Sequence, residues 1–284
     1  MASSVNVERA PALFISHGGG PFPILNEDHE PWRQMVRGYS TIFDNVKGII
    51  FFTAHWETSQ PSISAASDVQ IFFDYEDMKD WLPKSAFEIH YEGKGDSALA
   101  QRIAKRLQDS GFEPVLNKER GWDHGVWIPM MLLRPSGDIP VIQMSVIKGQ
   151  DEADSTEKNI RVGQALESFR DEGYAIIGSG GSSHNFDEIT KAYTSLTVGA
   201  KVPPGAELFE DFLESVVSVS DPIDRKSKLS TWREAAGNEI AHVPGSSEHL
   251  MPFMTVCGAG GHGIGKRSDM WDLVGSPVGF YLWK

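Results

Sequence analysis

The chain has 284 residues, of which 40% are hydrophobic and 23% charged, and its formal net charge is −13 at pH 7. Such a chain can bury one full hydrophobic core, and we expect a single domain over residues 1–284, with residues 1–10 as a flexible N-terminus. The acidic balance argues against a nucleic-acid partner, and the single cysteine, Cys257, excludes an intramolecular disulfide. Because no apolar run reaches the roughly 20 residues that span a bilayer and no secretory signal is recognisable, we expect a cytoplasmic protein without a membrane partner.

The first half of the chain predicts strands separated by helical segments. Residues 12–16 and 48–53 are short apolar runs rich in β-branched and aromatic residues, which is typical of buried strands in a parallel sheet. Asp96 can cap a helix that Gly111 ends, because apolar residues recur at helical spacing between them. Residues 139–146 then predict another strand.

The second half continues the same alternation. A further helix leads directly into a predicted strand at 174–179. Residues 208–217 indicate an amphipathic helix, and Asp221 followed by Pro222 is typical of the start of another helix. The last predicted strand covers 278–283. This order favours an α/β fold.

Four histidines lie in loops that follow predicted strands or open a helix. They are His17 in Ser-His-Gly-Gly-Gly, His55 in Ala-His-Trp-Glu, His184 in Ser-His-Asn and His249 in Glu-His-Leu. Ligands of open α/β sheets bind beyond the carboxyl ends of the strands, so we expect these histidines to share one site. Neutral imidazole binds zinc and divalent iron, and three protein ligands leave positions open for catalysis. The fourth histidine could act as a base.

The position of His249 is indicated by a nearby proline. Pro252 is tolerated in the first turn of a helix, so the helix that follows should begin near His249. Glu248 and His249 would then both lie at a helix entrance, and both are plausible metal ligands. Four other histidines lie in polar or glycine-rich stretches, and we expect them at the surface: His29, His90, His242 and His262.

Five segments, taken in order, resemble the 4,5-DOPA extradiol dioxygenase-like branch of the class III extradiol ring-cleaving dioxygenases, the LigB-type superfamily. They are His17-Gly18, Ala54-His55-Trp56-Glu57, Gly121 through Trp127 (GWDHGVW), Gly178 through Asn185 and Glu248 through Pro252. The resemblance spans nearly the whole chain. It implies a single-domain, three-layer α/β/α fold with a central mixed, mostly parallel β-sheet. It also implies a divalent metal and O2-dependent opening of a catechol ring beside its hydroxyls.

The resemblance also implies roles for individual residues. His17, His55 and His249 become the expected metal ligands, and His184 becomes the general base and a possible fourth ligand. Related enzymes of the wider class use two histidines and a carboxylate, so Glu248 stays open as an alternative third ligand. We favour His249, because this branch carries a histidine at the matching place.

His124 is expected to contact a substrate hydroxyl or an oxygen intermediate, with Asp123 orienting its ring. Aromatic and polar side chains near the motifs are candidates for the substrate pocket. The candidates are Trp56, Asp123, Trp127 and Asn185, with Trp122, Phe186 and Phe22 as further aromatic walls. The segment 72–91 is rich in aromatic and acidic residues and is interpreted as a lid or pocket rim.

The expected cofactor is Fe(II), and the expected partners are a small catechol and O2. His184, with an ordinary pKa of about 6.5, could remove the second hydroxyl proton near neutral pH. Zn(II) fits the same ligands but has no redox chemistry. Two alternatives stay open, namely a zinc-dependent hydrolase on the same metal site and a catalytically silent relative that binds a metal or a catechol. The natural catechol, the cleavage position and the oligomeric state are not specified by the sequence.

Overall fold

The computed structural model describes residues 9–194 and 200–284. Most of the predicted flexible N-terminus, namely residues 1–8, lies outside the described residues. Its last two residues are held in place: the Ala10 amide donates to the Arg170 carbonyl over 3.0 Å, and Arg9 pairs with Glu167 over 2.7 Å.

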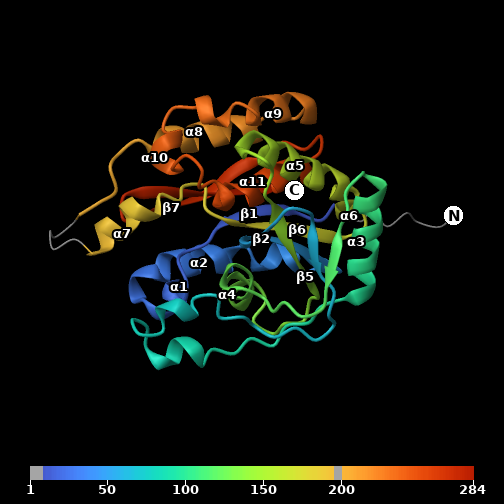
Figure 1. Ribbon diagram of the computed structural model, residues 1–284, viewed down its shortest axis with the longest axis horizontal. Helices are drawn as coiled ribbons and strands as arrows, with labels where there is room; N and C mark the ends of the chain where they lie inside the picture. Colours follow the sequence, from blue (N-terminus) through green and yellow to red (C-terminus); the bar gives the residue numbers. More distant parts are fainter. Residues whose placement is uncertain (1–8, 195–199) are drawn as a thin grey trace.

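An eight-stranded mixed sheet forms the centre of the molecule (Figure 1), with the strand order β4-β3-β5-β2-β6-β1-β8-β7. The strands are β1 (Ala12–Ser16), β2 (Gly48–Thr58), β3 (Ser62–Ser64), β4 (Val115–Asn117), β5 (Val141–Ile147), β6 (Tyr174–Gly180), β7 (Lys266–Leu273) and β8 (Ser276–Trp283). The central strands β5, β2, β6 and β1 pair in parallel, whereas β8 and β7 extend the sheet in antiparallel fashion beyond β1. The predicted α/β class with a mixed, mostly parallel sheet is confirmed.

Helices cover both faces of this sheet and give the three layers that were expected (Figure 1). The α-helices are α1 (Phe22–Leu25), α2 (Glu30–Gly38), α3 (Ser97–Asp109), α4 (His124–Leu133), α5 (Glu152–Leu166), α6 (Ser168–Asp171), α7 (Phe186–Thr194), α8 (Ala206–Val217), α9 (Pro222–Leu229), α10 (Asn238–Ala241) and α11 (Met251–Ala259). The short 3₁₀ helices are η1 (Glu27–His29), η2 (Ser40–Phe43), η3 (Glu76–Met78), η4 (Lys84–Phe87), η5 (Trp232–Glu234) and η6 (Glu248–Leu250). In the described part of the chain, no helix is long and apolar enough to cross a membrane.

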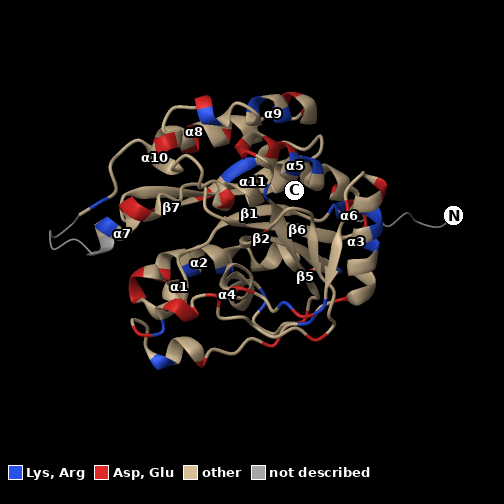
Figure 2. Cartoon of the chain, viewed as in Figure 1, with Lys and Arg blue, Asp and Glu red and all other residues tan. Residues whose placement is uncertain are grey.

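The alternation of side chains along each strand separates two hydrophobic cores. In β1, Phe14 points to the layer of α3, α5, α8 and α11, and its ring meets Phe253 of α11 edge-on at 5.4 Å. Leu13 and Ile15 point to the opposite layer, which contains α2 and α4. The strands β1, β5 and β6 contain no charged residue, and the charged residues lie mainly on the outer helices and loops (Figure 2). Such strands are buried on both faces, as a parallel sheet requires.

The predicted helix starts are confirmed at two caps. The side chain of Asp96 accepts the amides of Ala98 and Leu99 at the start of α3, and Asp221 caps α9 in the same way. Gly111 follows α3 with a φ of 84°, a conformation that glycine adopts without strain. Cys257 is buried in α11.

Helix α11 lies unusually close to α5. A Cβ added at Gly163 of α5 would lie 1.9 Å from the carbonyl oxygen of Thr255, and one added at Gly258 of α11 would lie 2.2 Å from that of Ile160. The two backbones are thus in direct contact, which only glycine permits. This contact fixes α11 against the sheet, and the residues just before α11 reach the ends of β1, β2 and β6.

Candidate metal centre

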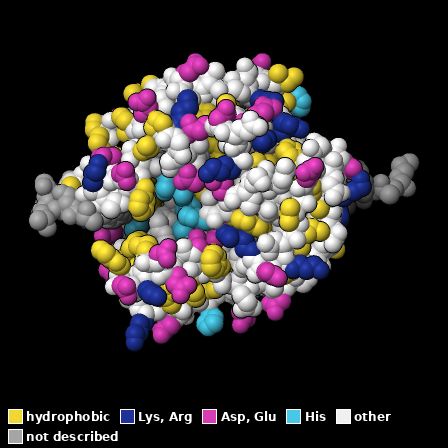
Figure 3. Space-filling model, viewed as in Figure 1, with side chains coloured by type: hydrophobic (Ala, Val, Ile, Leu, Met, Phe, Trp, Pro, Cys, Tyr) yellow, Lys and Arg dark blue, Asp and Glu magenta, His cyan; other side chains and the backbone are white. Residues whose placement is uncertain are grey.

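Five histidines from separate parts of the chain meet near the carboxyl ends of the central strands. His17 follows β1, His55 lies in β2, His124 begins α4, His184 follows β6 and His249 lies in η6. Figure 3 shows histidine side chains grouped in a hollow on one face of the molecule. The ring centroids of His17, His55 and His249 lie 4.9, 5.0 and 5.4 Å from one another. The structure therefore brings together the four histidines that were expected to share a site, with His124 beside them.

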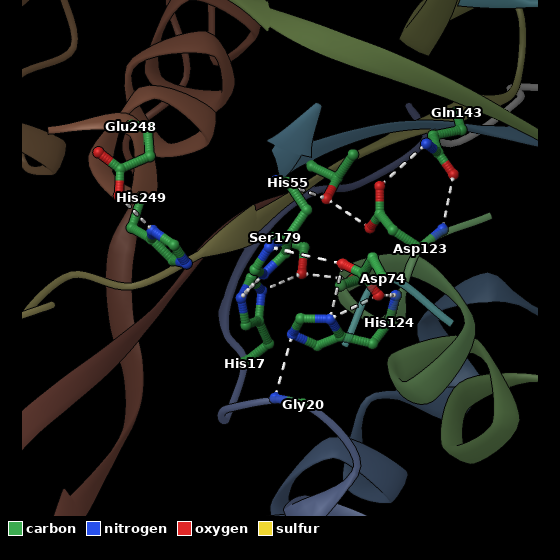
Figure 4. Close-up of polar contacts among 12 residues, drawn as sticks. His17, Gly20, His55, Asp74, Asp123, His124, Gln143, Ser179, Glu248 and His249 are labelled. Atoms are coloured by element: carbon green, nitrogen blue, oxygen red, sulfur yellow. Dashed lines mark hydrogen bonds and ion pairs between the residues drawn. The ribbon is translucent and has the colours of Figure 1, made fainter. Parts of the chain in front are cut away.

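The orientation of His17 follows from Ser179 of β6. Ser179 Oγ donates to the carbonyl oxygen of Gly125 over 2.6 Å, so it is left to accept the Nδ1–H of His17 over 2.7 Å. The His17 amide donates to the Gly180 carbonyl over 2.9 Å, which holds the chain beyond β1. Nε2 of His17 therefore carries the lone pair, and this nitrogen faces the other histidines (Figure 4).

His55 lies where β2 leaves its regular pairing with β5. The register of the two strands shifts between Thr53 and Glu57, and the His55 amide donates to Thr53 Oγ1 over 3.2 Å. Arg120 Nη2 donates to the His55 carbonyl over 3.0 Å. A bulge of this kind re-aims a side chain, and here the Nε2 atoms of His55 and His17 lie 2.9 Å apart.

Gly180 allows η6 to approach the end of β6. A Cβ added at Gly180 would lie 2.1 Å from the carbonyl oxygen of His249, and this oxygen accepts the Gly181 amide over 2.9 Å. His249 Nδ1 donates to Glu248 Oε1 over 2.9 Å, so Nε2 carries the lone pair of His249. Figure 4 shows the ring extending from Glu248 toward His17.

His184 stacks on His249, with ring centroids 3.4 Å apart and planes within 10° of parallel. Its amide donates to the Ala241 carbonyl over 2.7 Å, but its Nδ1 is buried without a hydrogen-bond partner among the described residues. Burial lowers the pKa of His184 to about 4, although Glu248 acts in the opposite direction. The pKa of His184 therefore lies below the ordinary value that was expected, and burial leaves the ring uncharged near neutral pH but a weaker base than an exposed histidine.

His124 is oriented by Asp74, a residue that the sequence patterns do not mark. Both carboxylate oxygens of Asp74 accept from His124 Nδ1, over 2.9 and 2.8 Å, and Oδ1 also accepts the His124 amide over 3.0 Å. The carboxylate of Asp123, the expected partner, instead accepts from Thr53 and Gln143. That prediction is wrong because Asp123 binds side chains of β2 and β5, whereas Asp74 reaches the ring from a loop distant in sequence.

The residues predicted for the substrate pocket lie at different depths. Asp123 and Trp127 have no exposed surface, so in this structure they are part of the buried interior and do not line an open space. Trp56 is nearly buried and lies under the guanidinium of Arg120, 4.9 Å from its carbon. Asn185 donates to a main-chain carbonyl of α10 over 3.1 Å, which holds the turn that leads into α7.

Aromatic side chains flank the histidines from two sides. The segment 72–91, predicted as a lid or rim, contributes Tyr75, whose ring centroid lies 6.1 Å from that of His124. On the other side, the ring of Phe186 lies 6.0 Å from that of His184, and 62% of Phe186 is exposed.

The protonation states favour a divalent cation at this position. Burial lowers the pKa of His17, His55 and His249 well below the ordinary histidine value, and neighbouring histidines lower it further. Burial tends to raise the pKa of Asp74, but the hydrogen bonds from His124 outweigh it and bring the value to about 2. Neutral imidazoles beside a carboxylate are the donors that zinc and divalent iron accept, so the residues present fit such a metal.

Two of the histidines expected at the surface are buried. His90 and His262 are exposed, as predicted, but His29 is only 3% exposed and His242 is fully buried. His242 Nε2 lies 2.9 Å from the carbonyl oxygen of Ser182, and the ring of His29 packs on Trp271. The polar sequence around these histidines does not show that distant segments cover them.

The chain matches one protein family over most of its length. A family described as the catalytic LigB subunit of aromatic ring-opening dioxygenase matches residues 11–275. The 4,5-DOPA dioxygenase extradiol of Beta vulgaris is 33% identical over 92% of this chain and 90% of its own length. Dioxygenase tasH of Hapsidospora irregularis is 31% identical over 99% of this chain and 87% of its own length. The crystal structure of the uncharacterized protein JW3007 of Escherichia coli K12 has the same fold, with a TM-score of 0.73 and 23% identity over 96% of this chain and 99% of that one.

Proposed function

Because this chain belongs to the LigB family of aromatic ring-opening dioxygenases, we propose that it is a metal-dependent extradiol dioxygenase that uses O2 to open a catechol-type ring. The observation that carries the proposal is the cluster of neutral imidazoles, in which the ring centroids of His17, His55 and His249 lie 4.9 to 5.4 Å from one another. The ligand atoms of His17, His55 and His124 lie within 4.8 Å of one another, and so do those of His184, Glu248 and His249. A set of three protein ligands leaves positions open for a substrate and for O2.

In this proposal, His17, His55 and His249 hold the divalent metal through Nε2. Ser179 and Glu248 support the assignment, because each accepts the Nδ1–H of its histidine and leaves Nε2 for the metal. Glu248 then orients His249 and is not itself the third ligand. The stacked ring of His184 is close enough to serve as a fourth ligand in the absence of substrate.

Bound Fe(II) would supply the exchange of electrons between the catechol and O2, which Zn(II) in the same place does not supply. The chain's own residues hold and move the protons. His184, whose Nδ1 makes no hydrogen bond to the described residues and lies 3.8 Å from Glu248 Oε1, removes a proton from one catechol hydroxyl. His124 Nε2, which accepts the Gly20 amide in this structure, would accept the other hydroxyl in its place, and either histidine returns a proton when the ring opens. Tyr75 and Phe186 contact the faces of the substrate ring.

Oxygen uptake tests the proposed function directly. The protein is loaded with ferrous iron under anaerobic conditions, mixed with a panel of catechols, and followed by an oxygen electrode together with visible spectra. We expect uptake that depends on iron and on the catechol, together with a new yellow chromophore from the opened ring. In His184→Ala, kcat should fall by about 10²- to 10⁴-fold, the usual contribution of a general acid–base group.

Three controls make the result specific. Zinc-loaded protein should consume no O2, because zinc has no redox chemistry. His262→Ala removes an exposed histidine outside the cluster and outside the segment 72–91, and it should leave uptake unchanged. If iron binds but no catechol supports oxygen uptake, the dioxygenase proposal is wrong. Hydrolysis by the zinc-loaded protein without O2 would then point to a metal hydrolase. Tight binding of a catechol without turnover would point to a catalytically silent relative.

A further inference from the structure

The carboxylate of Asp74 contacts two histidines of the cluster, His124 and His55. Its carboxylate binds both the ring Nδ1 and the main-chain amide of His124, and Oδ2 also lies 3.6 Å from Nδ1 of His55. The last distance is too long for a hydrogen bond but places the negative charge behind the His55 ring. The side chain of Asp74 is only 11% exposed, so water competes little for these contacts.

These contacts define which nitrogen of His124 carries the proton. An ionised carboxylate accepts hydrogen bonds and donates none, so the nitrogen that faces Asp74 must be Nδ1–H. Nε2 of His124 then keeps its lone pair, and it accepts the Gly20 amide over 3.2 Å. Both contacts are consistent with one tautomer, and Figure 4 shows the His124 ring held between Asp74 and Gly20.

We propose that Asp74 is a positioning residue that holds His124 as the Nδ1–H tautomer, so that Nε2 carries the lone pair that accepts the Gly20 amide here and that a substrate hydroxyl would use in its place. The kinetic consequence of this inference rests on the proposed function, whereas the tautomer itself does not. Because Asp74 belongs to the segment 72–91, the same contacts also fasten this segment to the histidine cluster. The segment therefore supplies a part of the site and is not only a cover.

The variant Asp74→Asn discriminates between positioning and simple packing. Asparagine has nearly the same shape, but its amide nitrogen donates hydrogen bonds. With the side-chain oxygen on the His124 amide, the introduced nitrogen would face Nδ1 and stabilise the Nε2–H tautomer, which presents a proton where the substrate needs an acceptor. Asp74→Ala leaves the tautomer undetermined. Positioning predicts that the isosteric asparagine is at least as harmful as alanine, whereas packing alone predicts the reverse order.

The first measurement is nitrogen NMR on full-length protein with labelled histidines, in the metal-free and the zinc-loaded states. His124→Phe identifies the signals of His124 by their loss. We expect the Nδ1–H tautomer in the unmodified protein and the Nε2–H tautomer in Asp74→Asn. Asp77→Asn removes an equal charge from an exposed position in the same segment, and it should leave the His124 tautomer unchanged.

The second measurement is steady-state kinetics of the iron-loaded variants with a catechol that the unmodified protein turns over. We expect kcat/KM to fall about 10- to 100-fold in Asp74→Asn, mainly through kcat, since outer carboxylates of histidine sites contribute this much. Asp74→Ala should lose no more than Asp74→Asn, and Asp77→Asn should lose nothing.

Some outcomes would overturn the inference. An Nε2–H tautomer of His124 in the unmodified protein would do so even if no variant folds, and so would an unchanged tautomer in Asp74→Asn. A kcat/KM that is lower in Asp74→Ala than in Asp74→Asn would reduce Asp74 to a packing residue. If the unmodified protein turns over no catechol, the proposed function fails, but the NMR result still decides the role of Asp74.

Discussion

At the scale of single residues, three of the five imidazoles in the cluster are oriented by an acceptor from another part of the chain or from a neighbouring residue. Ser179 accepts from His17, Glu248 accepts from His249, and Asp74 accepts from His124. Such partners select the tautomer and the direction of the ring, so they contribute to metal affinity without touching the metal.

Ser179→Ala tests this idea at the best-defined acceptor. Without the hydroxyl, His17 loses the partner of its Nδ1–H, so its ring and tautomer are less well defined. We expect zinc affinity, measured by competition with a chelator, to fall about 10- to 100-fold. Ser145→Ala removes another buried serine hydroxyl, on β5, that contacts no histidine. Equal metal affinities in the two variants would show that Ser179 has no such role.

At the scale of elements, the site depends on where α11 begins. His249 lies in η6, immediately before this helix, and the position of α11 is set by its contact with α5. Packing at a glycine contact leaves no space for a side chain, and a methyl group there must separate the two backbones. If the backbones of α5 and α11 move apart, η6 moves with α11. The hydrogen bond from the Gly181 amide, at the end of β6, to the His249 carbonyl is then disturbed.

Gly163→Ala should therefore weaken both the fold and the site. We expect the free energy of unfolding in urea to fall by about 3 kcal/mol, at the upper end for an overpacked core, because the new methyl meets the Thr255 carbonyl. Zinc affinity should fall with it. Gly38→Ala is the matched control, since nothing lies within 4 Å of a Cβ at this exposed position in α2, and it should stabilise by up to about 1 kcal/mol. A fully stable Gly163→Ala would contradict the close contact.

At the scale of the whole molecule, a buried carboxyl links helix α8 to the C-terminal strand of the sheet. Glu210 of α8 is fully buried, and it accepts hydrogen bonds from the Tyr281 hydroxyl and the Gly279 amide of β8. Burial raises the pKa of Glu210 above its ordinary value, although these hydrogen bonds and the nearby charge of Arg267 act against the rise. The folded protein thus prefers the protonated form.

This preference makes stability depend on pH with a definite sign. The contribution of protonated Glu210 to the free energy of unfolding is fully present below the pKa of Glu210 in the unfolded chain, about 4.3. It is lost as the pH rises through the raised pKa of Glu210 in the folded protein. The unfolding free energy of Glu210→Gln, relative to the unmodified protein, should therefore increase with pH above about 4.3. Urea unfolding at a series of pH values measures it. Glu239→Gln changes an exposed carboxyl and should show a difference that is flat with pH; the same flat line for Glu210→Gln would refute the prediction.

The features that arise from neighbouring residues can be predicted from the sequence. Apolar runs identify β1, β2 and β6, because a strand buried on both faces has few polar side chains. The caps Asp96 and Asp221 mark helix starts, since their carboxylates bind amides two and three residues later. The four clustered histidines were also found in this way, because ligands gather where parallel strands end.

The orientation of those histidines, and the burial of the others, depend on the packing of the folded chain. Asp74 lies 50 residues before His124, and Ser179 lies 162 residues after His17, so no local pattern connects the partners. The same holds for His242, which is covered by segments far from it in sequence, and for the low pKa of His184, which arises from burial. Hydrogen bonds and burial of this kind depend on which distant segments pack together, and that is a property of the folded chain alone.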